Sequence, residues 1–152
     1  MTKIVVDTNI VFSAILNINS KIGQDLLTSD NIYDFYAPKY LREEILQHQE
    51  KLKARANLGS PEFMEVYEMI LKKITILNHS IIEEKNYKKA INLCEDIDLN
   101  DVPFVAFSIF LKCKMWTGDK KLMNGLKLKG FKNFTTTDDL FEYRLKITRK
   151  NK

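Results

Sequence analysis

Five short runs of apolar and β-branched residues recur along the chain, and each ends at polar or turn-forming residues. The first run, Ile4 to Val6, stops at Asp7, as expected of a buried strand that ends in a polar turn. The run from Ile74 to Leu77 is rich in β-branched side chains, which favour strands. The pattern predicts strands at residues 4–6, 32–37, 74–77, 114–117 and 134–136.

The segments between these runs carry apolar residues three and four positions apart, which is the spacing of amphipathic helices. Pro38 is expected to open one helix, and Gly59 to end it in a left-handed conformation. Ser60 is expected to cap the next helix, and Ser80 with Glu83 has the spacing of a capping box. We predict helices at residues 10–16, 20–28, 39–56, 60–71, 80–95, 104–111, 119–128 and 138–147.

Strands and helices therefore alternate along the whole chain. This order argues for a parallel sheet with helices on both faces, because parallel strands need crossover connections. We predict an α/β fold: a three-layer sandwich around a central, mostly parallel sheet of about five strands. The 152 residues, 45% apolar and 29% charged, suit a single domain over residues 1–152 and exclude a disordered or disulfide-stapled chain.

The two cysteines give no sign of a metal or disulfide framework. Cys94 and Cys113 lie outside any CxxC pair, and neither His48 nor His79 stands beside them. This spacing argues against a zinc site and favours buried free thiols, which are typical of a reducing compartment. The chain has no apolar run of signal-peptide or membrane length. We expect a cytoplasmic protein without a membrane partner.

Charge is distributed unevenly along the chain. The whole sequence carries 24 basic and 20 acidic residues, but residues 120–152 alone have a net charge of +7, which leaves −3 for the remainder. A basic tail from about residue 144 on an acidic body suits a protein that binds a polyanion. A solvated final helix with a lysine-rich end is the alternative interpretation.

Acidic residues follow several of the predicted strands or stand in the turns beside them. Asp7 follows the first strand, Asp119 follows the fourth, and Asp98 and Asp101 lie in the turn before a very apolar helix. The carboxyl ends of parallel strands meet at one edge of the sheet, so these groups should lie together. Carboxylates gathered there would repel one another unless a cation joined them. Oxygen ligands alone indicate Mg²⁺ or Mn²⁺.

Each of these acids also has a simpler interpretation. Asp7, Asp101 and Asp119 stand where an aspartate caps the helix that follows. Asp98 suits a turn, and Glu44 alone would be an ordinary surface residue. Only their joint occurrence favours a site.

Four segments of the sequence together resemble the PIN-domain family, within its class of small toxin-like ribonucleases of the VapC type. These segments are IVVDTNIVFSAIL, YLREEILQH, DIDLNDVPFVAFSIF and KMWTGDKKL, and the resemblance covers about residues 3–140. It implies an acidic constellation of Asp7, Glu44, Asp101 and Asp119, with Asp98 as a further metal ligand. It also implies that the polar side chains of Asn9 and Thr117 orient the carboxylates. Glu44 is preferred to Glu43 because it shares the helical stripe of Tyr40 and Leu41.

The resemblance implies a ribonuclease that uses Mg²⁺ or Mn²⁺ to hydrolyse phosphodiester bonds, as the toxin of a toxin–antitoxin pair. Its expected partners are RNA, an antitoxin protein and a second copy of the chain. The basic tail would then hold the RNA backbone through Arg144, Lys146, Arg149 and Lys150.

Two other functions can be set against this one. A haloacid-dehalogenase-like phosphatase needs a second acid two residues after its nucleophilic aspartate, and Asn9 stands at that position. It also needs an acid four or five residues after Asp119, where Met123 and Asn124 stand. The remaining alternative is a catalytically idle PIN scaffold that binds RNA or protein.

Overall fold

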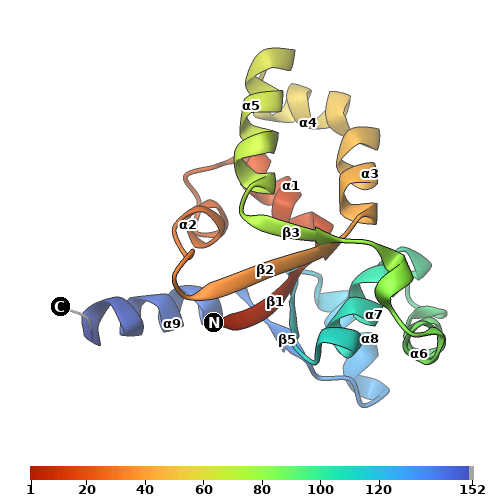
Figure 1. Cartoon of the computed structure of the whole chain (residues 1–152). Coiled ribbons are helices and arrows are strands. Elements are labelled where there is room, and N and C mark those ends of the chain that lie inside the picture. Colours follow the sequence, from red (N-terminus) through yellow and green to blue (C-terminus); the bar gives the residue numbers. More distant parts are fainter. Residues whose placement is uncertain (151–152) are drawn as a thin grey trace.

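A five-stranded, wholly parallel sheet forms the centre of the molecule in the computed structural model, which describes residues 1–150 (Figure 1). The strand order is β3-β2-β1-β4-β5, so the chain begins in the middle of the sheet and builds outward in both directions. The strands are β1 (Thr2–Val6), β2 (Tyr33–Pro38), β3 (Ile74–Leu77), β4 (Lys114–Trp116) and β5 (Phe134–Thr135). The predicted α/β architecture and its five strands are confirmed.

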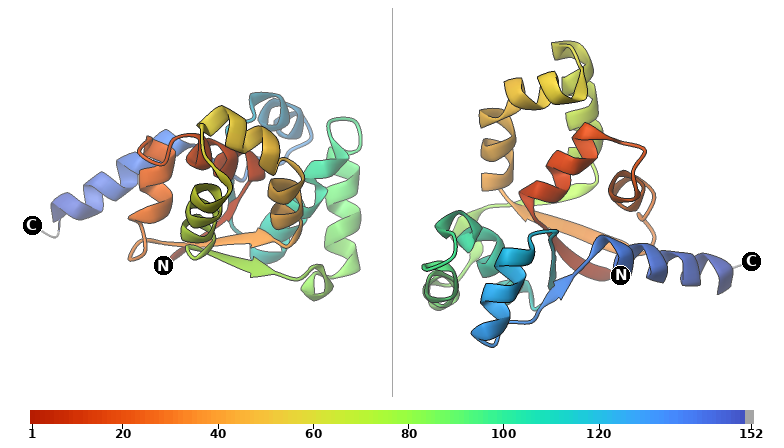
Figure 2. Two further views of the ribbon diagram at one scale, coloured as in Figure 1. Left: turned by 90° about the horizontal axis from the view of Figure 1, so that it is seen from above. Right: turned by 180° about the vertical axis from the view of Figure 1, so that it is seen from behind.

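Helices cover both faces of this sheet and complete three layers (Figure 2). One layer holds α1 (Thr8–Leu16), α2 (Lys21–Leu27), α3 (Tyr40–Gln47), α4 (Gln49–Ala56), α5 (Ser60–Leu71) and α9 (Thr137–Lys150). The other holds α6 (Glu84–Cys94), α7 (Val102–Leu111) and α8 (Lys120–Leu128), and 3₁₀ turns η1 (His79–Ile81) and η2 (Leu99–Asp101) precede α6 and α7. Within residues 1–150, no helix combines the length and apolarity needed to span a bilayer.

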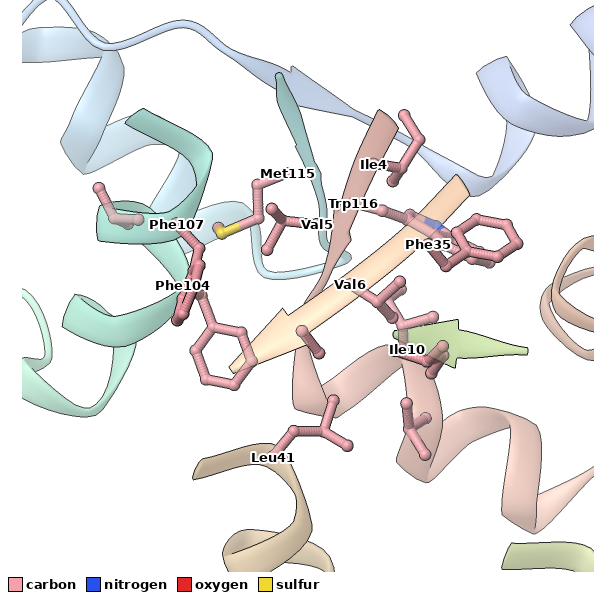
Figure 3. Close-up of a cluster of buried hydrophobic side chains, with 14 of the residues drawn as sticks. Ile4, Val5, Val6, Ile10, Phe35, Leu41, Phe104, Phe107, Met115 and Trp116 are labelled. Carbon is pink, nitrogen blue, oxygen red and sulfur yellow. The ribbon is translucent and has the colours of Figure 1, made fainter. Parts of the chain in front are cut away.

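Side chains on the central strands alternate between these two layers, as the pleat of a strand requires. Val5 and Met115 point towards α7, where Phe104 also lies, whereas Val6 and Trp116 point towards the α1 side (Figure 3). All five are at most 1% exposed. Burial of side chains of this size stabilises the fold by roughly 1.5–3 kcal/mol each, so the middle of the sheet is held rigidly. The carboxyl end of β1 is therefore a firm support for the residues that follow it.

The single helix expected over residues 39–56 differs from the structure at its start and in its middle. Pro38 ends β2, paired in register with Leu77 of β3, and the helix opens after Lys39 instead. A proline is tolerated there because the ladder needs no further amide at the strand's end. The helix is then broken at His48, whose backbone leaves the helical region at φ −104° and ψ 11°, so α3 and α4 are separate.

The expected helix ends at Gly59 and Ser80 are also wrong. Asn57, at φ 57°, takes the left-handed position after α4, while Gly59 is extended and stands before Ser60, the first residue of α5. Asparagine is among the few residues that tolerate this conformation. The expected capping box is replaced by η1, and α6 begins only at Glu84. The other element ends lie within three residues of those expected, and β3 and α5 match at both ends.

Candidate active site

Asp7 stands at the carboxyl end of β1, in the middle of the sheet. Its side chain is 3% exposed and makes no capping hydrogen bond to α1, although it occupies the capping position. Instead, the Thr117 hydroxyl donates to Asp7 Oδ2 at 2.8 Å, and the Asp119 amide donates to that same hydroxyl at 3.1 Å. Thr117 follows β4, the strand paired with β1, so the register of the sheet joins these two strand ends. The Thr117 hydroxyl therefore contacts Asp7 directly, and its orienting role stays a prediction.

Glu44 reaches the same end of the sheet from α3. The Thr8 hydroxyl donates to Glu44 Oε1 at 2.7 Å, so the residue after Asp7 holds the glutamate beside it. Glu44 is half-buried, whereas Glu43 is exposed, and only Glu44 faces inward. Thr8 was not singled out from the sequence. Its place in the Asp7-Thr8-Asn9 triplet was the available signal.

Asp98 and Asp101 flank the short turn η2 that leads into α7. Asp98 is exposed, and one of its carboxylate oxygens accepts a hydrogen bond from the Asn100 amide at 2.9 Å, which stabilises the turn. Asp101 is half-buried at the capping position of α7 but makes no capping bond. Above this turn, the Tyr40 hydroxyl of α3 donates to Asn100 Oδ1 at 3.0 Å, a contact that links the two sides of the site.

Asp119 caps α8, because its Oδ1 accepts from the Leu122 amide at 3.0 Å. This capping bond occupies one carboxylate oxygen and fixes the side chain at the end of β4. Asn9 behaves differently: its side chain is exposed and makes no hydrogen bond within residues 1–150. The expected orienting contact from Asn9 is therefore not seen.

The carboxylates are close enough to perturb one another. The pKa of Asp101 is raised to about 8, first by burial and then by Asp7, Asp98, Asp119 and Glu44. Burial also raises the pKa of Asp7 to about 6, although the Thr117 hydrogen bond lowers it. Burial and the neighbouring Asp7 raise the pKa of Glu44, against the hydrogen bond from Thr8. No ion pair in residues 1–150 includes any of the four predicted catalytic acids.

This donor set suits a hard divalent cation, which would relieve the repulsion that raises the pKa of Asp101. Asp7, Glu44, Asp101 and Asp119 supply oxygen ligands without a histidine or thiolate among them, as Mg²⁺ and Mn²⁺ prefer. Within the described part of the chain, no three acidic, imidazole or thiol groups stand close enough to share one ion. The ligands are thus of the right chemical kind, and sharing one ion requires their side chains to move closer together.

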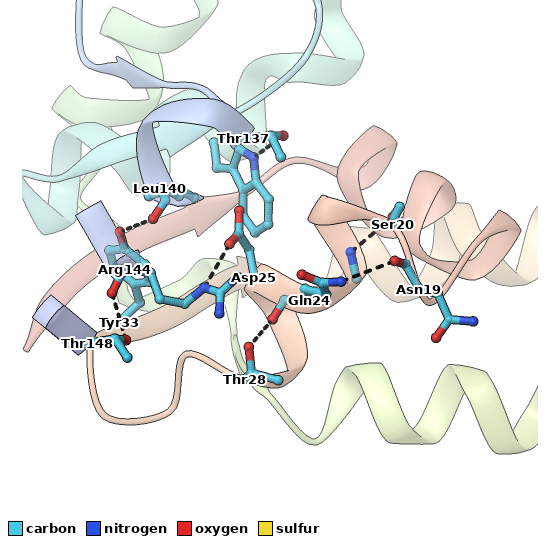
Figure 4. Close-up of polar contacts among 12 residues, drawn as sticks. Asn19, Ser20, Gln24, Asp25, Thr28, Tyr33, Thr137, Leu140, Arg144 and Thr148 are labelled. Carbon is cyan, nitrogen blue, oxygen red and sulfur yellow. Dashed lines mark hydrogen bonds and ion pairs between the residues drawn. The ribbon is translucent and has the colours of Figure 1, made fainter. Parts of the chain in front are cut away.

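The predicted RNA-binding residues lie elsewhere. Helix α9 starts near the carboxyl end of β4, where the Thr137 hydroxyl accepts a hydrogen bond from the Trp116 indole. The helix then runs out past the start of β1, beside the N-terminus of the chain (Figure 1). Lys146, Arg149 and Lys150 are exposed on its far part. Arg144 is not: its side chain is 15% exposed, and its Nε donates to Asp25 of α2 at 3.2 Å (Figure 4). The structure does not bring these four residues to the acids.

The family-model comparison matches the PIN domain over residues 5–144. The chain belongs to the PIN-domain family. Among solved structures, it is similar to a chain of VapBC2 from Rickettsia felis bound to a DNA fragment from their promoter. That match has a TM-score of 0.63 and 15% sequence identity, and it covers 89% of this chain and 97% of the other. It supports the fold of the PIN domain over nearly the whole chain. No curated protein matches the sequence.

Proposed function

We propose that this PIN domain is a metal-dependent endoribonuclease. The observation that carries the proposal is the gathering of Asp7, Glu44, Asp101 and Asp119 at one edge of the sheet, with the pKa of Asp101 raised to about 8 by burial and its acidic neighbours. Such a cluster destabilises the folded protein, so its presence is best explained by a cation that it binds.

The four acids would hold Mg²⁺ or Mn²⁺, with Asp98 as a further, solvent-exposed ligand. When bound, such an ion supplies a water of lowered pKa and stabilises the negative charge that develops on a phosphodiester. The protein's own contribution is to orient the ligands. Thr117 holds Asp7 through Oδ2, and Thr8 holds Glu44 through Oε1, so each hydroxyl restricts one carboxylate to one rotamer.

We further propose that the protein is the toxin of a toxin–antitoxin pair. The similarity in fold to a chain of a VapBC2 assembly supports this class, and it favours an antitoxin as a protein partner. We also propose that two copies of the chain form a homodimer. The phosphatase alternative is not supported, because the PIN-domain match covers residues 5–144. The idle scaffold is the competing hypothesis, and it differs by predicting no cleavage.

A single substitution separates these hypotheses. Wild type and Asp7→Asn are incubated with a mixed RNA pool and Mn²⁺, and the products are resolved on a denaturing gel. The nuclease proposal predicts cleavage by wild type that EDTA stops, together with loss of cleavage in a folded Asp7→Asn protein. Wild type that leaves every RNA intact would favour the idle scaffold.

The basic end of α9 is proposed as a separate contact for RNA that extends away from the acids. Its exposed residues are Lys146, Arg149 and Lys150, and each phosphate contact contributes a slope of roughly −0.7 to a log–log plot of affinity against salt. Changing all three residues to glutamine should weaken RNA binding and reduce the steepness of that slope by about two, while turnover at saturating RNA stays unchanged. An unchanged slope would show that the end of α9 is only a solvated helix and does not contact RNA.

A further inference from the structure

Helix α8 connects two parts of the acidic cluster that are distant in the sequence. Its first turn is capped by Asp119, which places that carboxylate at the end of β4. Further along, Gly125 of the same helix contacts Ile97 in the segment that joins α6 to α7, and Lys129, just after the helix, contacts Asp96 there. Two acids of the cluster, Asp98 and Asp101, lie in that segment, so its position relative to α8 sets the distance between them and Asp119.

The first contact is a close approach at Gly125. A Cβ at this position would lie 2.6 Å from Ile97 Cδ1 and 3.1 Å from Ile97 Cγ1, so any larger residue would push the end of the Ile97 side chain aside. Glycine thus lets α8 lie directly against the side chain of Ile97, four residues before Asp101. Ile97 is itself held in place, because its amide and that of Asp98 both donate to the Cys94 carbonyl at 2.9 Å.

The second contact is made by Lys129, the residue that follows α8. Its ammonium group donates to the carbonyl oxygens of Leu93 at 2.9 Å and Asn92 at 3.3 Å, and it pairs with the carboxylate of Asp96. The carbonyl groups in the last turn of a helix lack partners within the helix, so a cation there is favourable. Lys129 therefore holds the C-terminal end of α6 and the start of the connecting segment against the C-terminal end of α8.

We propose that Gly125 and Lys129 are positioning residues that set the Asp98–Asp101 turn at the right distance from Asp119 for metal binding. The inference rests on the proposed function, since it assumes that these acids share a cation. Neither residue touches the metal or the substrate in this proposal. Two independent contacts on one helix carry it: an atomic fit at Gly125 and a three-partner clamp at Lys129.

The first test removes the clamp while keeping the fold. Lys129→Gln is compared with Lys127→Gln, which loses the same charge from an exposed position of the same helix. Mn²⁺ affinity is measured by calorimetry without RNA, and cleavage is measured separately. Loss of residues that support metal ligands weakens binding by about 10- to 100-fold. We expect about 10-fold weaker Mn²⁺ binding for Lys129→Gln, wild-type binding for Lys127→Gln, and recovery of most of the affinity in Lys129→Arg.

The second test acts through packing and needs no change in charge. Gly125→Ala should displace Ile97 and weaken Mn²⁺ binding, while the double variant Gly125→Ala/Ile97→Val removes the clashing methyl group and should recover affinity. Circular dichroism establishes that each variant is folded. If Lys129→Gln fails to fold, the recovery in the double variant still decides the question.

The outcomes separate this inference from the proposed function. Folded Lys129→Gln and Gly125→Ala proteins with wild-type Mn²⁺ affinity would overturn the positioning role and leave Lys129 as a helix cap. Wild type that binds Mn²⁺ but cleaves no RNA would overturn the nuclease, while the affinity measurements would still test the positioning role. Wild type that binds no Mn²⁺ would overturn both.

Discussion

Replacing Asp7 by asparagine should make the metal-free protein more stable while it destroys metal binding. The carboxylate of Asp7 is almost completely buried, and its partner is a neutral hydroxyl from Thr117 rather than a cation. Asparagine has nearly the same shape and can accept the same hydrogen bond through its own oxygen. The substitution therefore removes a buried negative charge and little else.

The magnitude follows from the pKa of Asp7, which is raised from 3.8 to about 6 in the folded protein. Because the folded state prefers protonated Asp7, the fold is most stable with respect to this group below pH 3.8, and that stability is lost as the pH rises through 6. At pH 7.5, the ionised carboxylate costs the folded protein about 3 kcal/mol. The asparagine amide is also buried, so we expect a net gain of about 1–2 kcal/mol and a rise in Tm of roughly 2–8 °C.

The assay is thermal and urea unfolding in EDTA at pH 7.5 and again at pH 4. The matched control is Glu65→Gln, which removes one negative charge from an exposed position of α5. Asp7→Asn should be more stable than wild type at pH 7.5, and most of that difference should be absent at pH 4. Added Mn²⁺ should raise the Tm of wild type and of the control but not of Asp7→Asn.

A loss of stability in Asp7→Asn at pH 7.5 would refute this reasoning. It would mean that the ionised carboxylate stabilises the fold, as a structural helix cap does, and that burial does not penalise it. An equal gain in Glu65→Gln would refute it too, since the effect would then come from the overall charge of the protein. A gain that persists unchanged at pH 4 would show that the titration of Asp7 is not its cause.

Three further outcomes are expected. Glu44→Gln should lower the cleavage rate about 100-fold and Glu43→Gln should leave it unchanged in the same assay, because only Glu44 faces the site; equal losses would contradict this. Arg144→Met should lower the free energy of unfolding in urea by about 3 kcal/mol, because the charge of Asp25 is then buried without its partner. The double variant Arg144→Met/Asp25→Asn should recover much of this free energy, and no loss in Arg144→Met would show that the pair is dispensable. The metal-free wild type should lose stability as the pH rises from about 4 to about 8. Between the ordinary pKa of Asp101, 3.8, and its raised pKa, about 8, only the folded state holds the proton, so a flat profile over this range would contradict the raised pKa.

The sequence by itself determined the class of the fold and the region of the site. Short β-branched runs between amphipathic segments leave few choices other than a parallel sheet covered on both faces, and the five predicted strands are those observed. The positions of Asp7 and Asp119 after two of these strands followed from the same pattern, because parallel strands carry their carboxyl ends to one edge. Helix ends were harder to predict, since the break at His48 depends on local bonding that periodicity does not contain.

Only the tertiary structure decided which groups act together. The strand order pairs β1 with β4, and this register lets Thr117 bond to Asp7 across 110 positions of the chain. The packing of α3 selects Glu44 through Thr8, and the packing of α2 takes Arg144 out of solvent. Net charge showed that the C-terminal segment is basic, but the direction of α9 carries its end away from the acids. Sequence patterns record local periodicity, whereas these relations depend on distances between elements that are set when the core packs.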